Sequence, residues 1–218
     1  KRMRLIHQRQ IHSALARVFD APPAQPLKGD ALISKTPGLL LAVLTADCVP
    51  ILLVDRKHRV VAAVHAGWRG TLKRIAEKTL GRMRMTFGTH PRDVLAVFGP
   101  GIRRCCYEVG AEVAQAFHSQ FGCAAEWFDG PFERLVSGDA PNPLQWMDMQ
   151  PPGRQPPLPT VRLDLFAASR WQLVQAGVPE RNILESVLCT ACRTDILFSH
   201  RREHGRTGRL MGVIGIRM

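Results

Sequence analysis

Short apolar runs dominate the first half of the chain and predict β-strands. They cover residues 39–44, 49–55, 60–65 and 93–98, and each is bounded by polar or turn-forming residues. Near the C-terminus, residues 182–188 and 210–216 have the continuous apolar character of buried strands. The runs at 49–55 and 60–65 flank a short polar connector, so we expect them to pair as a hairpin.

Helical spacing of apolar positions occurs in three segments. Residues 71–85 form the first, which begins directly after Gly67-Trp68-Arg69-Gly70. Residues 111–121 form the second, and residues 163–176 form the third, which ends at Gly177 and Pro179. Hairpins combined with such helices predict an α+β fold with mixed sheets.

One segment has a different composition. Half of the 16 prolines lie between residues 129 and 160, and this density resists helix and central strand alike. We therefore predict a proline-rich surface insertion at 129–160. The remaining sequence has no internal repeat, and 218 residues suffice for one sizeable core, so we predict a single domain spanning 1–218.

The charge balance favours anionic ligands. Lys and Arg number 30 against 18 Asp and Glu, which gives a formal net charge of +12. One Tyr provides little of the aromatic surface that stacks on bases, so we expect no nucleic-acid partner. The basic residues are scattered except in one C-terminal cluster, which contains Arg201, Arg202, Arg206 and Arg209.

The sequence predicts a cytoplasmic protein with reduced cysteines. No apolar run approaches the roughly 20 residues that span a bilayer, and the basic start lacks the apolar stretch of a secretory signal. Reduced cysteines are candidate metal ligands, nucleophiles or small core residues. There are six, at Cys48, Cys105, Cys106, Cys123, Cys189 and Cys192.

The predicted hairpin brings a cysteine towards a histidine. Cys48 and His65 lie at similar distances from the connector, so folding the chain about its centre places them opposite each other. Directly opposed side chains have Cβ atoms about 4.5–5.5 Å apart, which is close enough to share one metal ion. The alternative is a small core cysteine beside a structural histidine. A metal site also needs a third ligand, and composition does not choose between His7 and His12.

Several motifs together carry a family resemblance. TADCVPILLVD, AAVHAGWRGT, FGPGIRRCCYEVG, the Cys189-Thr190 pair and FSHRR…GRTGR occur in that order. They closely resemble the bacterial laccase-domain family, also called multicopper polyphenol oxidase or peptidoglycan-editing factor. The resemblance runs from about Gln10 to the C-terminus outside the proline-rich insertion. It implies an α/β/β/α four-layer sandwich and a metal bound by His12, Cys48 and His65. Family members usually carry a further N-terminal segment before a QxH motif, which is Gln10-Ile11-His12 here, and we expect that segment to be absent.

The resemblance also implies an activity. Members of the family act on purine nucleosides, by phosphorolysis of adenosine, inosine, guanosine and methylthioadenosine and by deamination of adenosine. Two His and one Cys suit zinc, with copper as an alternative, and leave a fourth position for water. We therefore expect a cytoplasmic enzyme, a monomer or small homo-oligomer, that takes purine nucleosides and phosphate and has no membrane partner. In this interpretation Cys48 and His65 are also catalytic.

Further candidate residues surround this predicted site. Gly67–Gly70 before a helix would offer backbone N–H groups to an anion. The candidate phosphate-binding residues are Arg69, Gly70, Arg201 and Arg202. Candidate proton-transfer groups are Asp47 and Glu108, and Asp30 matches an acidic position of the family, although single carboxylates are more often structural.

Three other functions fit parts of the sequence. The first is copper-dependent oxidation of phenols, although laccase chemistry uses several copper ions and the chain has only 8 His. The second is a hydrolase for peptidoglycan precursors, with Cys48 as nucleophile and His65 as base. The third is a non-enzymatic basic binding module. Gly99-Pro100-Gly101 lacks the third glycine of a dinucleotide fingerprint, and Cys189–Cys192 lacks the second CxxC of a zinc ribbon.

Overall fold

A computed structural model describes residues 3–137 and 160–217 of the chain. These residues form two compact units. The first unit comprises Lys1–Arg103 with Leu165–Met218, and the second comprises Arg104–Asp164. The single domain expected from the sequence stays a prediction.

A six-stranded mixed sheet forms the centre of the first unit. Its order is β11 (Ile183–Glu185), β7 (Val94–Phe98), β5 (Val49–Asp55), β6 (Val60–Ala66), β3 (Ala31–Ser34) and β2 (Ala16–Val18). The predicted hairpin is present as the antiparallel β5–β6 pair in the middle of this sheet. Every residue of β6 is buried, because both faces of the strand are covered.

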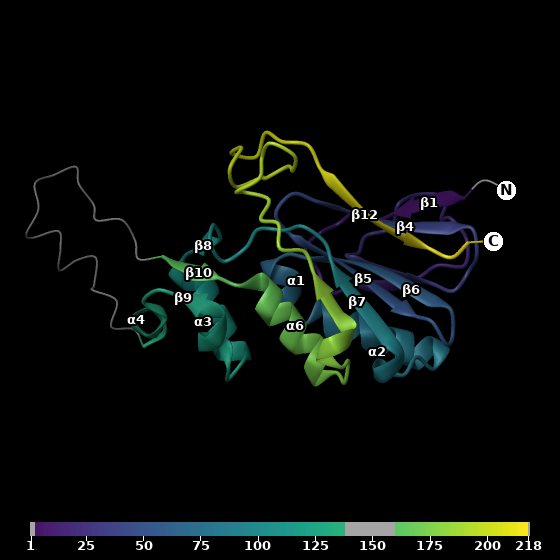
Figure 1. The fold of residues 1–218 in the computed structure, drawn as a ribbon, viewed down its shortest axis with the longest axis horizontal. Coiled ribbons are helices and arrows are strands. Elements are labelled where there is room, and N and C mark those ends of the chain that lie inside the picture. The colour runs from purple at the N-terminus through teal and green to yellow at the C-terminus, as the bar shows by residue number, and fades with distance from the viewer. Residues whose placement is uncertain (1–2, 138–159, 218) are drawn as a thin grey trace, which may run out of the picture. The chain divides into compact units, whose positions relative to one another are not determined.

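A three-stranded sheet packs on one face of the six-stranded sheet (Figure 1). In it, β4 (Leu39–Thr45) lies between β1 (Arg4–His7), which runs parallel to it, and β12 (Leu210–Gly215), which runs antiparallel. The core between the two sheets is apolar because alternate residues of each strand point inward. Its buried members are Ile6, Phe19, Leu32, Leu39, Leu41, Val43, Val61 and Ala63.

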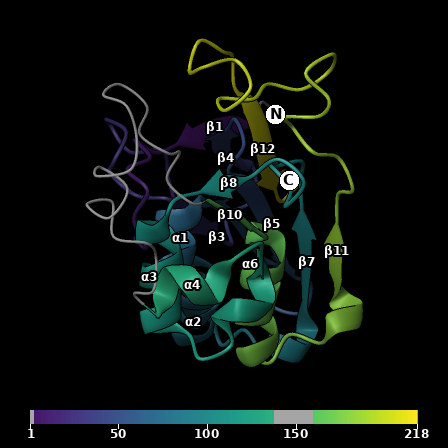
Figure 2. The ribbon, with the colours of Figure 1, turned by 90° about the vertical axis from the view of Figure 1, so that its left-hand side faces the viewer.

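Helices cover the other face of the six-stranded sheet (Figure 2). They are α1 (Trp68–Leu72), α2 (Ile75–Phe87) and α6 (Leu165–Gln175). A 3₁₀ turn at Pro91–Asp93 follows α2 in the chain, and another at Glu180–Asn182 follows α6. Phe166 of α6 packs on Phe98 of β7 with ring centroids 6.1 Å apart. Helices, the six-stranded sheet and the three-stranded sheet are thus three of the four expected layers, and the α+β sandwich is confirmed.

The prediction of one continuous helix over residues 71–85 is wrong. It is divided into α1 and α2 because Arg74 adopts a left-handed conformation with φ of 61°. The Arg74 guanidinium bonds Glu77 at 3.0 Å and lies 5.7 Å from the centroid of the Trp171 ring. The break redirects α2 so that Ile75, Ala76, Thr79, Leu80 and Met83 face the sheet.

The two C-terminal strands exist, but the prediction that they are buried is wrong. Leu184 is 54% exposed in β11, and Met211 is 51% exposed in β12. Both strands lie at the edge of their sheets, so one face of each meets solvent. An apolar run cannot distinguish a central strand from such an edge strand.

The second unit contains a small sheet and two helices. Its strands are β8 (Glu108–Val109), β10 (Val161–Leu163) and β9 (Phe128–Asp129), in that order. Helix α3 (Ala111–Gln120) confirms the helix predicted at 111–121, and a 3₁₀ turn (Ala124–Trp127) follows it. Within the predicted proline-rich surface insertion at 129–160, the structure describes a short helix, α4 (Phe132–Val136), that buries Phe132 and Leu135, and the surface insertion itself stays a prediction. Residues 138–159 of that prediction lie outside the described residues. No described helix combines the length and the apolar character needed to cross a membrane.

Candidate metal centre

The β5–β6 hairpin brings Cys48 and His65 together, but not in the predicted register. Pro50 lies opposite His65, so the predicted direct opposition of Cys48 and His65 is wrong. The chain turns over residues 56–59, with Arg59 left-handed at φ of 53°, and the turn is centred further along than expected. Cys48 therefore lies directly before β5, and its Sγ lies beside Gly67. Its Sγ and the ring nitrogens of His12 and His65 still lie within 4.8 Å of one another.

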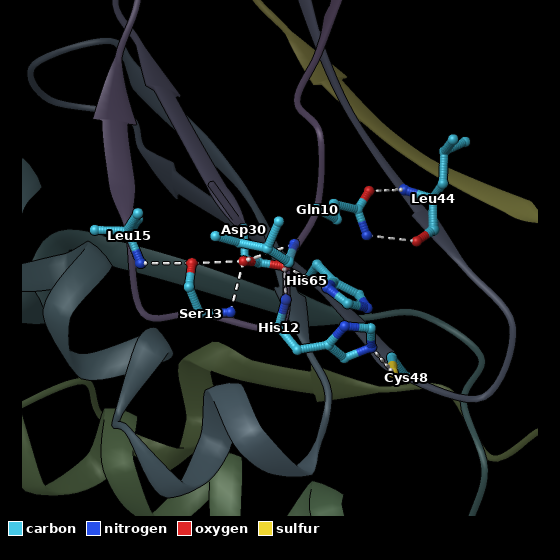
Figure 3. Close-up of polar contacts among 9 residues, drawn as sticks. Gln10, His12, Ser13, Leu15, Asp30, Leu44, Cys48 and His65 are labelled. Carbon is cyan, nitrogen blue, oxygen red and sulfur yellow. Dashed lines mark hydrogen bonds and ion pairs between the residues drawn. The ribbon is translucent and has the colours of Figure 1, made fainter. Parts of the chain in front are cut away.

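His12 completes this cluster from the segment that follows β1 (Figure 3). The side-chain amide of Gln10 bonds both the N–H and the carbonyl of Leu44, each at 2.8 Å. Leu44 is in β4, the strand that leads to Cys48, so Gln10 ties the His12 segment to the Cys48 segment. His12 Nε2 lies 4.0 Å from Cys48 Sγ. Among His7 and His12, the structure brings His12 to the cluster.

Asp30 orients two members of the cluster at once. Its Oδ1 lies 2.9 Å from Nδ1 of His65 and accepts the backbone N–H of His12 at 3.0 Å. Its Oδ2 accepts the N–H and the hydroxyl of Ser13, at 2.7 and 2.6 Å. These bonds hold His12 in a left-handed conformation with φ of 55°. The carboxylate also fixes the His65 tautomer, because a hydrogen on Nδ1 leaves Nε2 as the ligand atom.

Burial and charge shift the ionisation of these groups. Burial alone would raise the pKa of the Cys48 thiol, but His12 and His65 lower it to about 6. Burial alone would lower the pKa of His65, but Asp30 and the Cys48 thiolate raise it to about 9. Burial would likewise raise the pKa of Asp30, yet His65 and Ser13 hold it well below its usual range. At neutral pH the cluster is therefore a thiolate beside an imidazolium.

The residues fit a single metal ion. Thiolate sulfur and imidazole nitrogen are donors that zinc prefers, with ligand distances of about 2.3 Å for sulfur and about 2.0 Å for nitrogen. Cu(II) also binds such a set tightly. His65 is buried, Cys48 is half-buried and His12 is exposed, so the cluster opens to solvent on the His12 side. This tripod, defined as His12, Cys48 and His65, can hold an ion and leave one position for a ligand.

Replacement of Gly67 by alanine is expected to weaken metal binding by about tenfold or more. An added Cβ would lie 2.8 Å from Cys48 Sγ and 3.1 Å from His12 Cδ2, so the ligands must move. The backbone of Gly67 suits any residue, with φ of −87° and ψ of 172°, so the effect is steric. Titration with Zn²⁺ against a competing chelator measures it. Gly81→Ala in α2 is the control, because no atom lies within 4 Å of its added Cβ. Equal affinities of the two variants would contradict the close approach.

Metal binding is expected to release about one proton per ion at pH 7.5. Between the pKa of Cys48, about 6, and that of His65, about 9, the thiol is already ionised and His65 must lose a proton to bind. Affinity should therefore rise roughly tenfold per pH unit across this range. Calorimetry in buffers of different ionisation enthalpy measures the proton count. Binding without proton release at pH 7.5 would contradict the imidazolium form of His65.

The Gly67–Gly70 turn, whose backbone N–H groups were predicted to bind an anion, has two other structural features. Helix α1 is only 5 residues long. Gly70 is buried, and a Cβ added there would lie 3.2 Å from the carbonyl oxygen of Ser13, so the glycine allows the close approach of this backbone. Arg69 is exposed, and its guanidinium carbon lies 4.4 Å from the centroid of the Trp68 ring. Contacts of Arg69 and Gly70 with phosphate stay predictions.

The remaining sequence candidates occupy different places. Asp47 is buried directly before Cys48 and accepts the backbone N–H of Arg201 at 2.6 Å. Arg201 and Arg202 are exposed on the loop that precedes β12. Glu108 is exposed on β8 of the second unit, and its predicted proton-transfer role is untested. The sequence assigned no specific role to Asp30 and none to Gln10, because their partners are distant in the chain: Leu44 is 34 residues from Gln10, and His65 is 35 residues from Asp30.

Comparison with known proteins identifies relatives of the chain. A family model described as multi-copper polyphenol oxidoreductase laccase matches residues 1–217. The chain is 37% identical over 187 residues to a purine nucleoside phosphorylase of Bacteroides thetaiotaomicron, which covers 86% of the chain and 60% of the relative. It is 36% identical over 214 residues to adenosine deaminase RL5 from an unknown prokaryotic organism, which covers 94% of the chain and 72% of the relative. The chain thus spans about 60% of the length of the Bacteroides phosphorylase.

Solved structures share the fold. The crystal structure of the hypothetical protein YfiH of Bacillus licheniformis matches with a TM-score of 0.82 and 30% identity over 98% of the chain and 74% of that protein. YlmD of Geobacillus stearothermophilus matches with a TM-score of 0.77 and 31% identity over 99% of the chain and 74% of that protein.

Proposed function

The chain belongs to the multi-copper polyphenol oxidoreductase laccase family, and from this premise we propose that it is a metal-dependent purine nucleoside phosphorylase with adenosine deaminase and methylthioadenosine phosphorylase activity. The relatives named purine nucleoside phosphorylase and adenosine deaminase support this proposal. Its substrates would be purine nucleosides and phosphate, and it would act in the cytoplasm as a monomer or small homo-oligomer.

The observation that carries the proposal is the tripod with its exposed side. His12, Cys48 and His65 would hold zinc, with copper as the alternative. A bound ion acts as a Lewis acid and lowers the pKa of a ligating water. The chain's residues prepare the site: Asp30 keeps His65 and His12 in place, and Gln10 keeps the His12 segment against β4. A substrate would approach from the His12 side, because His12 is exposed and His65 is buried.

Basic residues on segments attached to the tripod support a phosphate co-substrate. Asp47, the neighbour of Cys48, binds the backbone of Arg201, so the loop that carries Arg201 and Arg202 is tied to the ligand segment. Arg69 follows Gly67, which touches Cys48, and stacking on Trp68 restrains its guanidinium. These arginines would bind the phosphate oxyanion through charge-assisted hydrogen bonds.

Incubation of the metal-replete protein with adenosine tests the proposal. With phosphate we expect adenine and ribose 1-phosphate, and without phosphate we expect inosine, both resolved by chromatography. Methylthioadenosine with phosphate should release adenine. A metal-replete preparation of the natural protein that yields none of these products would overturn the proposal.

A second candidate function is a hydrolase that uses the Cys48 thiolate as nucleophile. The lowered pKa of Cys48, about 6, favours it, because a thiolate beside an imidazolium is the reactive form of catalytic cysteines. Copper-dependent oxidation of phenols is less favoured. Among the described residues, one cluster contains histidine and offers three ligands, whereas laccase chemistry needs several copper ions.

A further inference from the structure

Asp47 holds an unusual conformation beside a metal-ligand residue. It lies between β4 and Cys48, and its φ of 86° is in the left-handed region that residues other than glycine rarely adopt. Its side chain is buried, with 7% of the residue exposed. Such a conformation persists only where surrounding contacts compensate its energetic cost.

Three other segments converge on this residue. Asp47 Oδ1 accepts the hydroxyl of buried Thr190 at 2.6 Å, and Oδ2 accepts the backbone N–H of Arg201 at 2.6 Å. The Asp47 carbonyl accepts the N–H of Ile102 at 2.7 Å. The N–H of Thr190 in turn bonds the carbonyl of Gly101 at 3.1 Å. Both carboxylate oxygens are therefore engaged by donors of the chain itself.

Residues 199–209, called the arginine loop below, contain Arg201, are rich in basic side chains and are held by hydrogen bonds within the loop. Glu203 accepts the N–H of Ser199 at 2.9 Å, and the hydroxyl of Ser199 accepts the N–H of Arg202 at 3.1 Å. These hydrogen bonds hold the loop in one conformation, so its position depends on the contacts that attach it to the rest of the protein. Its exposed basic side chains are His200, Arg201, Arg202, His204, Arg206 and Arg209.

We propose that Asp47 is a positioning residue, which fixes the arginine loop relative to Cys48 so that one phosphate group can contact both the tripod side and the arginines. Its burial and the two structural hydrogen bonds of its carboxylate favour positioning over proton transfer. The inference rests on the proposed function in one respect, that phosphate is a substrate. It replaces the proton-transfer role that the sequence suggested for Asp47.

Two substitutions at Asp47 separate positioning from proton transfer. In Asp47→Asn, the amide oxygen can accept from Arg201 and the amide nitrogen can donate to the Thr190 hydroxyl. Asparagine also tolerates the left-handed conformation. Asp47→Ala loses both bonds. We expect Asp47→Asn to keep phosphate affinity, and Asp47→Ala to weaken it by about tenfold or more, with unchanged metal content.

The experiment measures the dissociation constant of inorganic phosphate by calorimetry on metal-replete protein, together with kcat and with KM for phosphate. Thr190→Val, which removes one bond only, is a second variant if Asp47→Ala fails to fold, and a smaller loss in the same direction is expected. Positioning predicts that KM for phosphate rises more than kcat falls in Asp47→Ala. An Asp47→Asn variant that binds phosphate normally but loses turnover about a hundredfold would overturn it in favour of proton transfer.

The controls also separate this inference from the proposed function. A wild-type protein that binds phosphate, together with an Asp47→Ala variant of unchanged phosphate affinity, would overturn the positioning role alone. A metal-replete wild-type protein that neither binds phosphate nor releases adenine would overturn the phosphorylase proposal, and the positioning role with it.

Discussion

Replacement of Asp30 by asparagine is expected to lower metal affinity roughly 10–100-fold, although Asp30 is not itself a ligand. The carboxylate accepts hydrogen bonds from His65 Nδ1, from the His12 N–H and from Ser13. An amide offers one acceptor oxygen in place of two, so at least one buried donor loses its partner. Both histidines then lose the orientation that points them at a common ion. Competition titration with Zn²⁺ measures the affinity.

Asp55→Asn is the matched control for this experiment. Asp55, like Asp30, is a fully buried carboxylate beside a histidine. Its Oδ2 lies 2.8 Å from Nδ1 of His58, and its Oδ1 accepts the backbone N–H groups of Lys57 and His58. It sits at the turn end of the β5–β6 hairpin, away from the tripod. Each variant should lower the free energy of unfolding of the metal-free protein by about 1–3 kcal/mol, because each leaves buried donors unsatisfied.

Only Asp30→Asn should also lower the metal affinity. A variant pair with equal loss of stability and equal, unchanged affinity would contradict the role of Asp30 in holding the ligands. Circular dichroism on denaturation provides the stability of both variants.

The sequence predicted the part of the site that depends on neighbouring strands. Two apolar runs around a polar connector are sufficient to predict the β5–β6 hairpin, and the hairpin brings Cys48 near His65. The register was wrong because it depends on the conformation of Arg59 in the turn. The family motifs, and not the spacing, selected His12 over His7.

The interactions of Asp30 and Gln10 could not be read from local patterns. Asp30 precedes β3, which pairs with β6 although β4 and β5 lie between them in the chain. Gln10 follows β1 and bonds β4 across a gap of 34 residues. Hydrophobic periodicity reports which face of a strand is buried, but not which distant strand lies beside it. The break at Arg74 was missed for a related reason, because tertiary contacts with Trp171 accompany it.

Replacement of Cys48 by serine is expected to have the largest effect on metal binding, beyond the roughly 10–100-fold loss caused by removing an outer partner. A serine hydroxyl stays protonated at neutral pH and is a far weaker ligand than a thiolate. The proposed phosphorolysis and deamination should be lost with the metal, and excess Zn²⁺ should restore only a small part of either activity. Metal analysis after dialysis, followed by the adenosine assay, measures both.

The same variant decides between the two roles that Cys48 can have. If the thiolate is a ligand, Zn²⁺ should protect it from alkylation in the wild-type protein, since donation of a sulfur lone pair to the ion lowers the nucleophilicity of the thiolate. If it is a nucleophile, Cys48→Ser should keep its metal and lose turnover, and the metal-bound wild type should still be alkylated. The closeness of both imidazoles to the sulfur, within 4.8 Å, favours the ligand role, because a nucleophile needs only one base while three converging donors suit an ion.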